Sequence, residues 1–103
     1  MSECIALTET TYYILLSLYK PLHGYGIMQR AAELSGGRVR LAAGTLYGAL
    51  NALVDKGWIA LLPGEGRKKE YRLTPEGLEI LKNELERLRE LVASGDMVLK
   101  EEA

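Results

Sequence analysis

Residues 43–59, AGTLYGALNALVDKGWI, contain the pattern that decides the fold. Leu46, Leu50 and Leu53 recur at helical spacing, and Gly57 is placed to end the helix in a left-handed cap. The other side of this helix carries small or hydrogen-bonding residues where lysine and glutamate are the usual choice. These residues are Thr45, Tyr47, Gly48 and Asn51. We therefore expect this side to contact something other than water.

The composition is that of one folded domain. The chain has 103 residues, of which 48% are hydrophobic and 26% are charged, which excludes a disordered or fibrous protein. The single cysteine, Cys4, cannot form an internal disulfide, and no apolar run approaches the roughly 20 residues that span a bilayer. A cytoplasmic protein without a membrane partner is expected.

The charge is distributed unevenly along the chain. Residues 38–72 carry seven basic and three acidic side chains, whereas residues 73–103 carry four basic and eight acidic ones. The net charge of -1 therefore conceals a basic middle and an acidic end. This asymmetry favours a local site for a polyanion, although surface charge scattered without function remains the alternative.

Two shorter helices are expected before residue 43. The first lies within residues 11–19 behind a capping threonine at position 8, 10 or 11. The second runs from about residue 25 to residue 34, after a breaker cluster at residues 20–24 that predicts a loop. Their expected interior residues are Ile14, Leu15, Leu18, Tyr19, Ile27, Met28, Ala31 and Leu34.

The pattern after Gly57 predicts a β-hairpin and then a long helix. Residues 58–62 and 70–73 read as strands around a basic turn. Thr74 and Pro75 are a strong start signal for the helix. Leucine and valine then recur at steps of three and four, as in a short coiled coil. These residues are Leu78, Leu81, Leu85, Leu88 and Val92.

This leucine seam predicts a partner helix in a second copy of the chain, with packing inside one subunit as the alternative. The helix is expected to cover residues 75–94, because the Ser94-Gly95-Asp96 run interrupts it and leaves a flexible tail at residues 95–103.

The predicted order of elements is that of a winged helix-turn-helix over residues 1–74, mainly α with a small β-hairpin, followed by the C-terminal dimerisation helix. In that fold the third helix enters the DNA major groove and the hairpin tip lies along the DNA backbone or minor groove. The side of the third helix with small or hydrogen-bonding residues suits the major groove, and the basic hairpin tip suits the DNA backbone. Tyr47 could instead pack its ring on the second helix.

Three motifs follow one another along the chain: PLHGYGIMQ at residues 21–29, GTLYGALNALVDKGWI at residues 44–59 and KEYRLTPEG at residues 69–77. In this order they resemble the PadR family of bacterial and archaeal transcriptional regulators. The resemblance runs from about residue 11 to residue 91. It implies a winged helix with a C-terminal dimerisation helix, of the short-tailed type, and a repressor that a small molecule releases from its operator.

The resemblance places Thr45 and Tyr47 at phosphates or bases, Tyr25 near the DNA backbone, and Lys68 and Lys69 in the wing. The basic residues of the middle of the chain and the small or polar residues of the third helix complete this set. The expected DNA-binding residues are Tyr25, Arg38, Arg40, Thr45, Tyr47, Gly48, Asn51, Arg67, Lys68 and Lys69. The chain departs from the family at Gly48, where many relatives carry proline. Its C-terminal helix also lacks aromatic residues, so an aromatic drug-binding sandwich there has no support.

The sequence thus predicts a homodimeric repressor on a pseudo-palindromic operator, with half-sites about 34 Å apart or a multiple of it. An effector of unidentified chemistry is expected at the dimer interface. A winged-helix module that binds protein instead of DNA is the main alternative. A hydrolase or redox enzyme, a metal site and a cofactor are not expected, because His23 has no nucleophile in its motif and Cys4 has no companion at ligand spacing.

Overall fold

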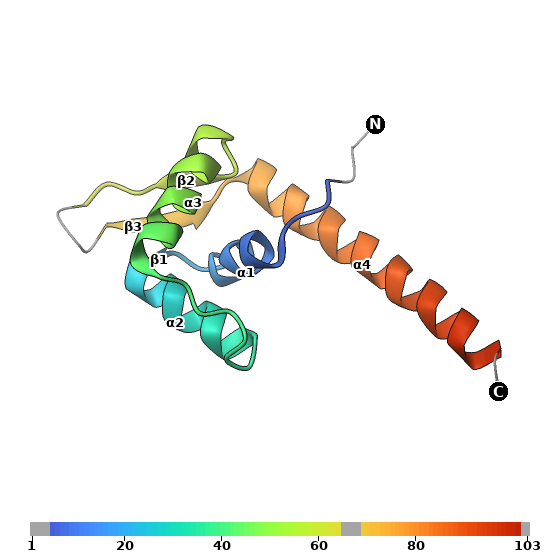
Figure 1. The fold of residues 1–103 in the computed structure, drawn as a ribbon. Helices are drawn as coiled ribbons and strands as arrows, with labels where there is room; N and C mark the ends of the chain where they lie inside the picture. Colours follow the sequence, from blue (N-terminus) through green and yellow to red (C-terminus); the bar gives the residue numbers. More distant parts are fainter. Residues whose placement is uncertain (1–4, 65–68, 102–103) are drawn as a thin grey trace.

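Three short helices pack with a small antiparallel sheet, and a long fourth helix projects from them (Figure 1). The computed structural model describes residues 5–64 and 69–101. Its elements are, in chain order, α1 (Glu9–Ser17), β1 (Leu22–His23), α2 (Gly24–Leu34), α3 (Ala43–Asp55), β2 (Ile59–Leu61), β3 (Glu70–Leu73) and α4 (Pro75–Glu101). The expected fold class, mainly helical with a hairpin and a C-terminal helix, is confirmed.

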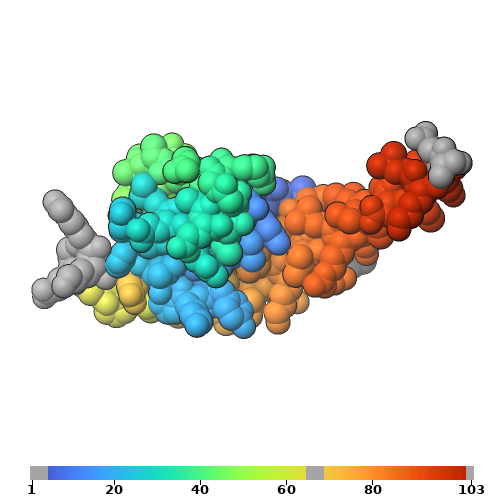
Figure 2. Space-filling view, turned by 90° about the horizontal axis from the view of Figure 1, so that it is seen from below, coloured from blue at the N-terminus to red at the C-terminus, as the bar shows by residue number. Residues whose placement is uncertain are grey.

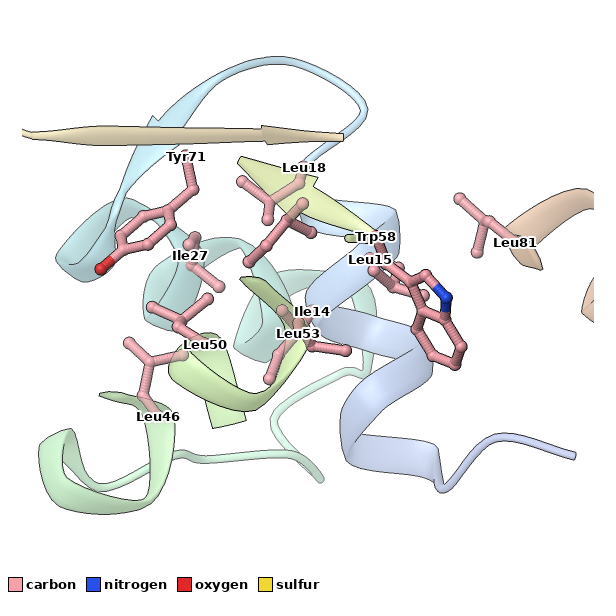
Figure 3. Packing of buried hydrophobic residues seen from close by; sticks show 11 residues of the cluster. Ile14, Leu15, Leu18, Ile27, Leu46, Leu50, Leu53, Trp58, Tyr71 and Leu81 are labelled. Carbon is pink, nitrogen blue, oxygen red and sulfur yellow. The ribbon is translucent and has the colours of Figure 1, made fainter. Parts of the chain in front are cut away.

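The apolar stripe of α3 lies at the centre of the core. Leu46 and Leu50 are fully buried, and Leu53 is buried beside them. They belong to one cluster with side chains from α1, α2, the sheet and α4 (Figure 3). The other members are Ile14, Leu15, Leu18, Ile27, Trp58, Ile59, Tyr71 and Leu81. The stripe read from the sequence therefore anchors α3 and leaves the opposite side of the helix at the surface.

Caps fix the ends of the helices where the sequence predicts them. Thr8 caps α1 by accepting a hydrogen bond from the amide of Thr11 at 3.1 Å. Thr74 caps α4 by accepting one from the amide of Gly77 at 3.0 Å. Gly57 follows α3 with φ at 80°, the left-handed conformation that a C-terminal cap requires. These three predictions are confirmed.

A strand that the sequence pattern does not predict completes the sheet. The prediction of a plain loop at residues 20–24 is wrong, because Leu22 pairs with Tyr71 and the strand order is β1-β3-β2. His23 then caps α2, its Nδ1 accepting a hydrogen bond from the amide of Gly26 at 3.0 Å. A strand of two residues is too short to show alternation, which is why the pattern misses it.

Two apolar residues expected inside lie at the surface. Tyr19 is 72% exposed, because α1 already ends at Ser17 and Tyr19 falls outside the helical face. Leu34, the last residue of α2, is also exposed. Both residues stand at the end of an element, where the direction of the chain decides burial more than periodicity does.

Helix α4 continues to Glu101, so the predicted interruption at residues 94–96 and the flexible tail are wrong for residues 95–101. One glycine inside a helix costs only about 1 kcal/mol relative to alanine, and the methionine, leucine and lysine that follow favour helix. Among the described residues, no helix is long and apolar enough to cross a membrane.

A buried carboxylate fastens α4 to the start of the domain. The side chain of Glu84 is only 2% exposed, and Arg87 donates hydrogen bonds to both of its oxygens at 2.6 Å and 2.8 Å. The amide of Leu7 donates another at 3.1 Å. The hydrogen bonds from Arg87 hold the pKa of Glu84 below its usual range; burial opposes this, and the Leu7 amide adds to it. Glu84 therefore ties the segment before α1 to α4.

This arrangement predicts a pH dependence of stability. A carboxylate whose pKa is lower in the folded chain stabilises the fold above its unfolded pKa of about 4.3, and that stability is lost as the pH falls through the folded pKa. Replacing Glu84 by glutamine should therefore lower the free energy of unfolding at pH 7 by about 1–3 kcal/mol. It should also flatten the acid limb of a stability profile measured by urea unfolding.

Glu86→Gln is the matched control, because Glu86 forms the same type of pair with Arg89 at 2.8 Å but is 66% exposed. Exposed pairs contribute little, so its profile should follow that of the wild type. Equal effects of the two substitutions would contradict the assignment to Glu84.

Candidate nucleic-acid interface

The side of α3 that faces away from the core is exposed along its length. We call it the α3 outer face, and it consists of Thr45, Tyr47, Gly48 and Asn51, all of them exposed. Figures 1 and 2 show α2 and α3 together on the part of the molecule opposite the projecting end of α4. The sequence prediction that these four residues share the surface side of one helix agrees with the structure.

The α3 outer face carries short or hydrogen-bonding side chains, and the space above it is open. A methyl group added at Gly48 would meet no heavy atom within 4 Å, and the same is true of Gly44 in the first turn. The backbone of α3 can therefore approach another molecule closely at these positions. Such a surface suits a groove whose walls are phosphates and whose floor is formed by base edges.

Tyr47 links the α3 outer face to α2. Its hydroxyl and ring lie over Gly24, where an added Cβ would be 2.4 Å from the Tyr47 hydroxyl oxygen. Tyr47 is nevertheless 45% exposed. The two interpretations of Tyr47 are thus compatible, because the ring packs on the start of α2 while part of the side chain stays at the surface.

Tyr25 and Arg40 lie along the exposed side of α2. Tyr25 is 64% exposed, and its hydroxyl accepts a hydrogen bond from Nε2 of Gln29 at 3.4 Å. Arg40, which follows α2 in the connection to α3, lines a shallow depression that also includes Gln29 and Met28. The structure therefore brings Arg40 to the same side of α2 as Gln29, the partner of Tyr25.

Arg38 lies elsewhere. Its guanidinium forms an ion pair and a hydrogen bond with Glu9 at the start of α1. These contacts with Glu9, together with a hydrogen bond involving Tyr13, raise the pKa of Arg38 above its usual range. The structure thus groups Arg38 with α1 and not with the α3 outer face.

The wing is the hairpin formed by β2 and β3. At the tip end of the strands, the amide of Leu62 donates to the carbonyl of Glu70 at 2.8 Å. Lys69 is exposed and lies beside Gly64, next to the tip of the hairpin. Arg67 and Lys68, the other two basic residues expected at the tip, lie outside the described residues.

The roles of two residues near this interface cannot be predicted from the sequence. Gly24 reads as part of a breaker cluster, yet it is buried beneath Tyr47. Tyr71 reads as an ordinary strand residue, yet its pKa is raised, first by burial and then by the neighbouring Tyr47. No sequence signal marks these two roles, because contacts between separate elements leave no periodic pattern.

No group of three or more histidine, cysteine, aspartate and glutamate residues within residues 5–64 and 69–101 is arranged to hold a metal ion. What the candidate interface offers to a partner is its open shape, its hydroxyl and amide groups and its exposed cations.

The far half of α4 presents a second exposed surface. We call it the distal α4 face, and it consists of Leu85, Leu88, Leu91, Val92, Val98 and Leu99, which share one side of the helix at spacings of three, four and seven. All are exposed except Leu88, which is half-buried. Of the predicted leucine seam, Leu81 belongs to the core of its own chain and Leu78 is half-buried, so Leu85, Leu88 and Val92 carry the seam outward.

Comparisons with known proteins agree with this arrangement. The family model described as the transcriptional regulator PadR-like family matches residues 13–83. A curated relative, an uncharacterized 37.1 kDa protein in transposon Tn4556 of Streptomyces fradiae, is 44% identical over 64 residues. Those residues are 62% of this chain but only 18% of the relative, so the chain spans less than a fifth of that protein's length.

Several solved structures have the same fold. A PadR family transcription regulator from Clostridium difficile is 26% identical, with a TM-score of 0.75, and the match covers 89% of this chain and 99% of that one. RosR from H. salinarum is 26% identical with a TM-score of 0.70, over 93% of this chain and 99% of that one. A PadR-like transcription factor from B. fragilis is 27% identical with a TM-score of 0.72, over 85% and 87% of the two chains.

Proposed function

The chain belongs to the PadR-like family of transcriptional regulators, which are not enzymes, and we propose that it acts as a homodimeric repressor on a pseudo-palindromic DNA site. The observation that carries this proposal is the open α3 outer face, placed beside the first turn of α2 in a chain that matches the family over residues 13–83. In a winged helix, α3 is the element that enters the major groove.

The chemistry of the α3 outer face supports DNA as the partner. Asn51 carries an amide that can pair with the edge of adenine, and the hydroxyl of Thr45 can donate to a phosphate or accept from a base. Lys69 next to the tip of the wing can neutralise a phosphate of the backbone. We therefore assign sequence reading to α3 and a sequence-independent share of affinity to the wing.

The distal α4 face supports the dimer. Exposed apolar side chains that continue for several turns are uncommon on a monomer and typically mark an interface. Leu99 is 70% exposed and Val92 is 63% exposed, although both lie on the side of α4 that faces the core nearer its start. A second copy of α4 would bury them and would fix the separation of the two α3 helices.

Release by an effector is the remaining part of the proposal. The distal α4 face carries a shallow, open depression of about 380 Å³, lined by Leu85, Leu88, Arg89, Val92, Ala93 and Asp96, which a partner helix would cover in the proposed dimer. A small molecule held there acts on DNA binding only to the extent that it binds two arrangements of the dimer with different affinity.

Deleting the gene tests repression. Transcription from the bound promoter should rise if the protein is a repressor; lowered transcription would identify an activator.

Titration of a labelled duplex from the upstream region of the chain's own gene tests DNA binding. The logarithm of the binding constant should fall linearly with the logarithm of the salt concentration, because bound phosphates release counterions. Absence of binding, or binding without a salt slope, would favour the alternative in which α3 and the wing bind an acidic protein.

Lys69→Ala should weaken binding to all duplexes about equally and reduce the salt slope by about one, since it removes one cation from the phosphate backbone. Lys82→Ala is the matched control, because Lys82 is an exposed lysine on α4 and its loss should leave the slope unchanged. A change of sequence preference without a change of slope would place Lys69 at a base and not at a phosphate.

A further inference from the structure

The first turn of α2 and Tyr47 of α3 are built around one glycine. A Cβ atom at Gly24 would lie 2.4 Å from the Tyr47 hydroxyl oxygen, 2.8 Å from Cζ and 3.3 Å from Cε1. Real Cβ atoms do not approach other atoms so closely, so any residue larger than glycine would displace the ring. Tyr47 can therefore occupy its position only because residue 24 has no side chain.

Tyr71 belongs to the core cluster on which α3 packs. Its ring is 8% exposed and extends from β3 into the core near Leu46 and Leu50 (Figure 3). Burial raises the pKa of its phenol, and Tyr47 adds to this effect. The contact that places the Tyr47 hydroxyl is the one with Gly24, at the backbone of α2.

The position of the Tyr47 hydroxyl determines what it can bind. Neither Tyr47 nor Tyr71 makes a side-chain hydrogen bond within the part of the chain that the structure describes, so the Tyr47 donor is available. The hydroxyl lies at the start of an 11-residue helix, where the helix dipole favours negative charge, although the amide of Gly26 is already bonded to His23. It is also drawn back against α2 at Gly24.

We propose that Gly24 is a positioning residue for DNA binding, which holds the Tyr47 hydroxyl where it donates a hydrogen bond to one phosphate of the DNA backbone. This inference rests on the proposed function and adds to it the chemical group that Tyr47 contacts and the residue that places it. Base reading then falls to Thr45 and Asn51, the other exposed polar side chains of the α3 outer face.

Gly24→Ala and Tyr47→Phe are the paired test. Each variant should bind the operator duplex about tenfold more weakly, the usual effect of one lost hydrogen bond to a charged group. The salt slope should stay that of the wild type, because a phenol carries no charge that replaces a counterion. The double variant should bind no more weakly than either single one, because both changes remove the same hydrogen bond.

A scan with duplexes that carry one neutral methylphosphonate each identifies the phosphate. One position should weaken the wild type but leave Gly24→Ala and Tyr47→Phe unaffected. Tyr19→Phe is the matched control, since it removes the hydroxyl of another exposed tyrosine, at the end of α1, and should bind like the wild type.

Several results would overturn the proposal. They are wild-type affinity of Gly24→Ala, additive losses in the double variant, and a methylphosphonate profile shared by all variants. Tyr47 is half exposed and has room to move outward, so Gly24→Ala should melt as a folded protein; an unfolded variant would show that Gly24 acts in the core and not on binding. A wild type that binds no duplex would instead refute the proposed function itself.

Discussion

Replacing Leu85 and Leu88 of α4 by aspartate should convert the proposed dimer into a monomer and lower operator affinity by about 100-fold or more. A dimer binds its second half-site as an intramolecular step, and a monomer loses that advantage entirely. Both substitutions place a charge on the distal α4 face, at its end nearer the core, where a partner helix would bury it without a counterion. Sedimentation velocity and duplex titration measure the two effects.

Asn83→Asp with Ser94→Asp is the matched control, because it adds the same charge on the opposite side of α4. This variant should remain dimeric and bind DNA like the wild type. Leu88 also borders Tyr12 and Glu84 within its own chain, so a melting curve must show that the leucine variant is folded. A folded leucine variant that still sediments as a dimer would contradict the assignment of the distal α4 face.

Gly77→Ala should lower the free energy of unfolding by about 3 kcal/mol or prevent folding. A Cβ atom at Gly77 would lie 1.8 Å from the carbonyl oxygen of Trp58, which is backbone and has little room to move. The same carbonyl accepts a hydrogen bond from the amide of Thr74 at 3.0 Å. The start of α4 can therefore approach β2 only if residue 77 has no side chain. Urea unfolding followed by circular dichroism measures the effect.

Gly95→Ala makes the same substitution in the same helix at a position where no atom lies within 4 Å of the added methyl. Alanine favours helix over glycine by about 1 kcal/mol, so this variant should be as stable as the wild type or more stable. A Gly77→Ala protein as stable as Gly95→Ala would show that α4 does not dock on Trp58 as described.

The sequence predicts the parts of the fold that carry a local signal. The apolar stripe of α3, the threonine caps at Thr8 and Thr74 and the left-handed Gly57 follow from spacing and residue type, and all are found in the structure. The missed strand β1 has only two residues, and the continued helix at Gly95 reflects a small propensity cost that its neighbours outweigh.

The candidate site is predictable only in part, for a related reason. The exposed residues of α3 share one helix, so periodicity places them together. Gly24 and Gly77 owe their importance to contacts with Tyr47 and Trp58, which belong to other elements. The sequence groups Arg38 with the basic residues expected to bind DNA, whereas the folded chain pairs it with Glu9. Contacts between distant parts of the chain become visible only once the elements are packed.

Selection of random duplexes by the purified protein, followed by sequencing of the bound fraction, tests the central claim most directly. The claim is sequence-specific binding by two α3 helices of a dimer. The predicted result is enrichment of two inverted half-sites whose centres lie about 34 Å apart, one helical turn, or a multiple of that distance. A bound fraction with no enriched sequence, or no bound fraction at all, would contradict it.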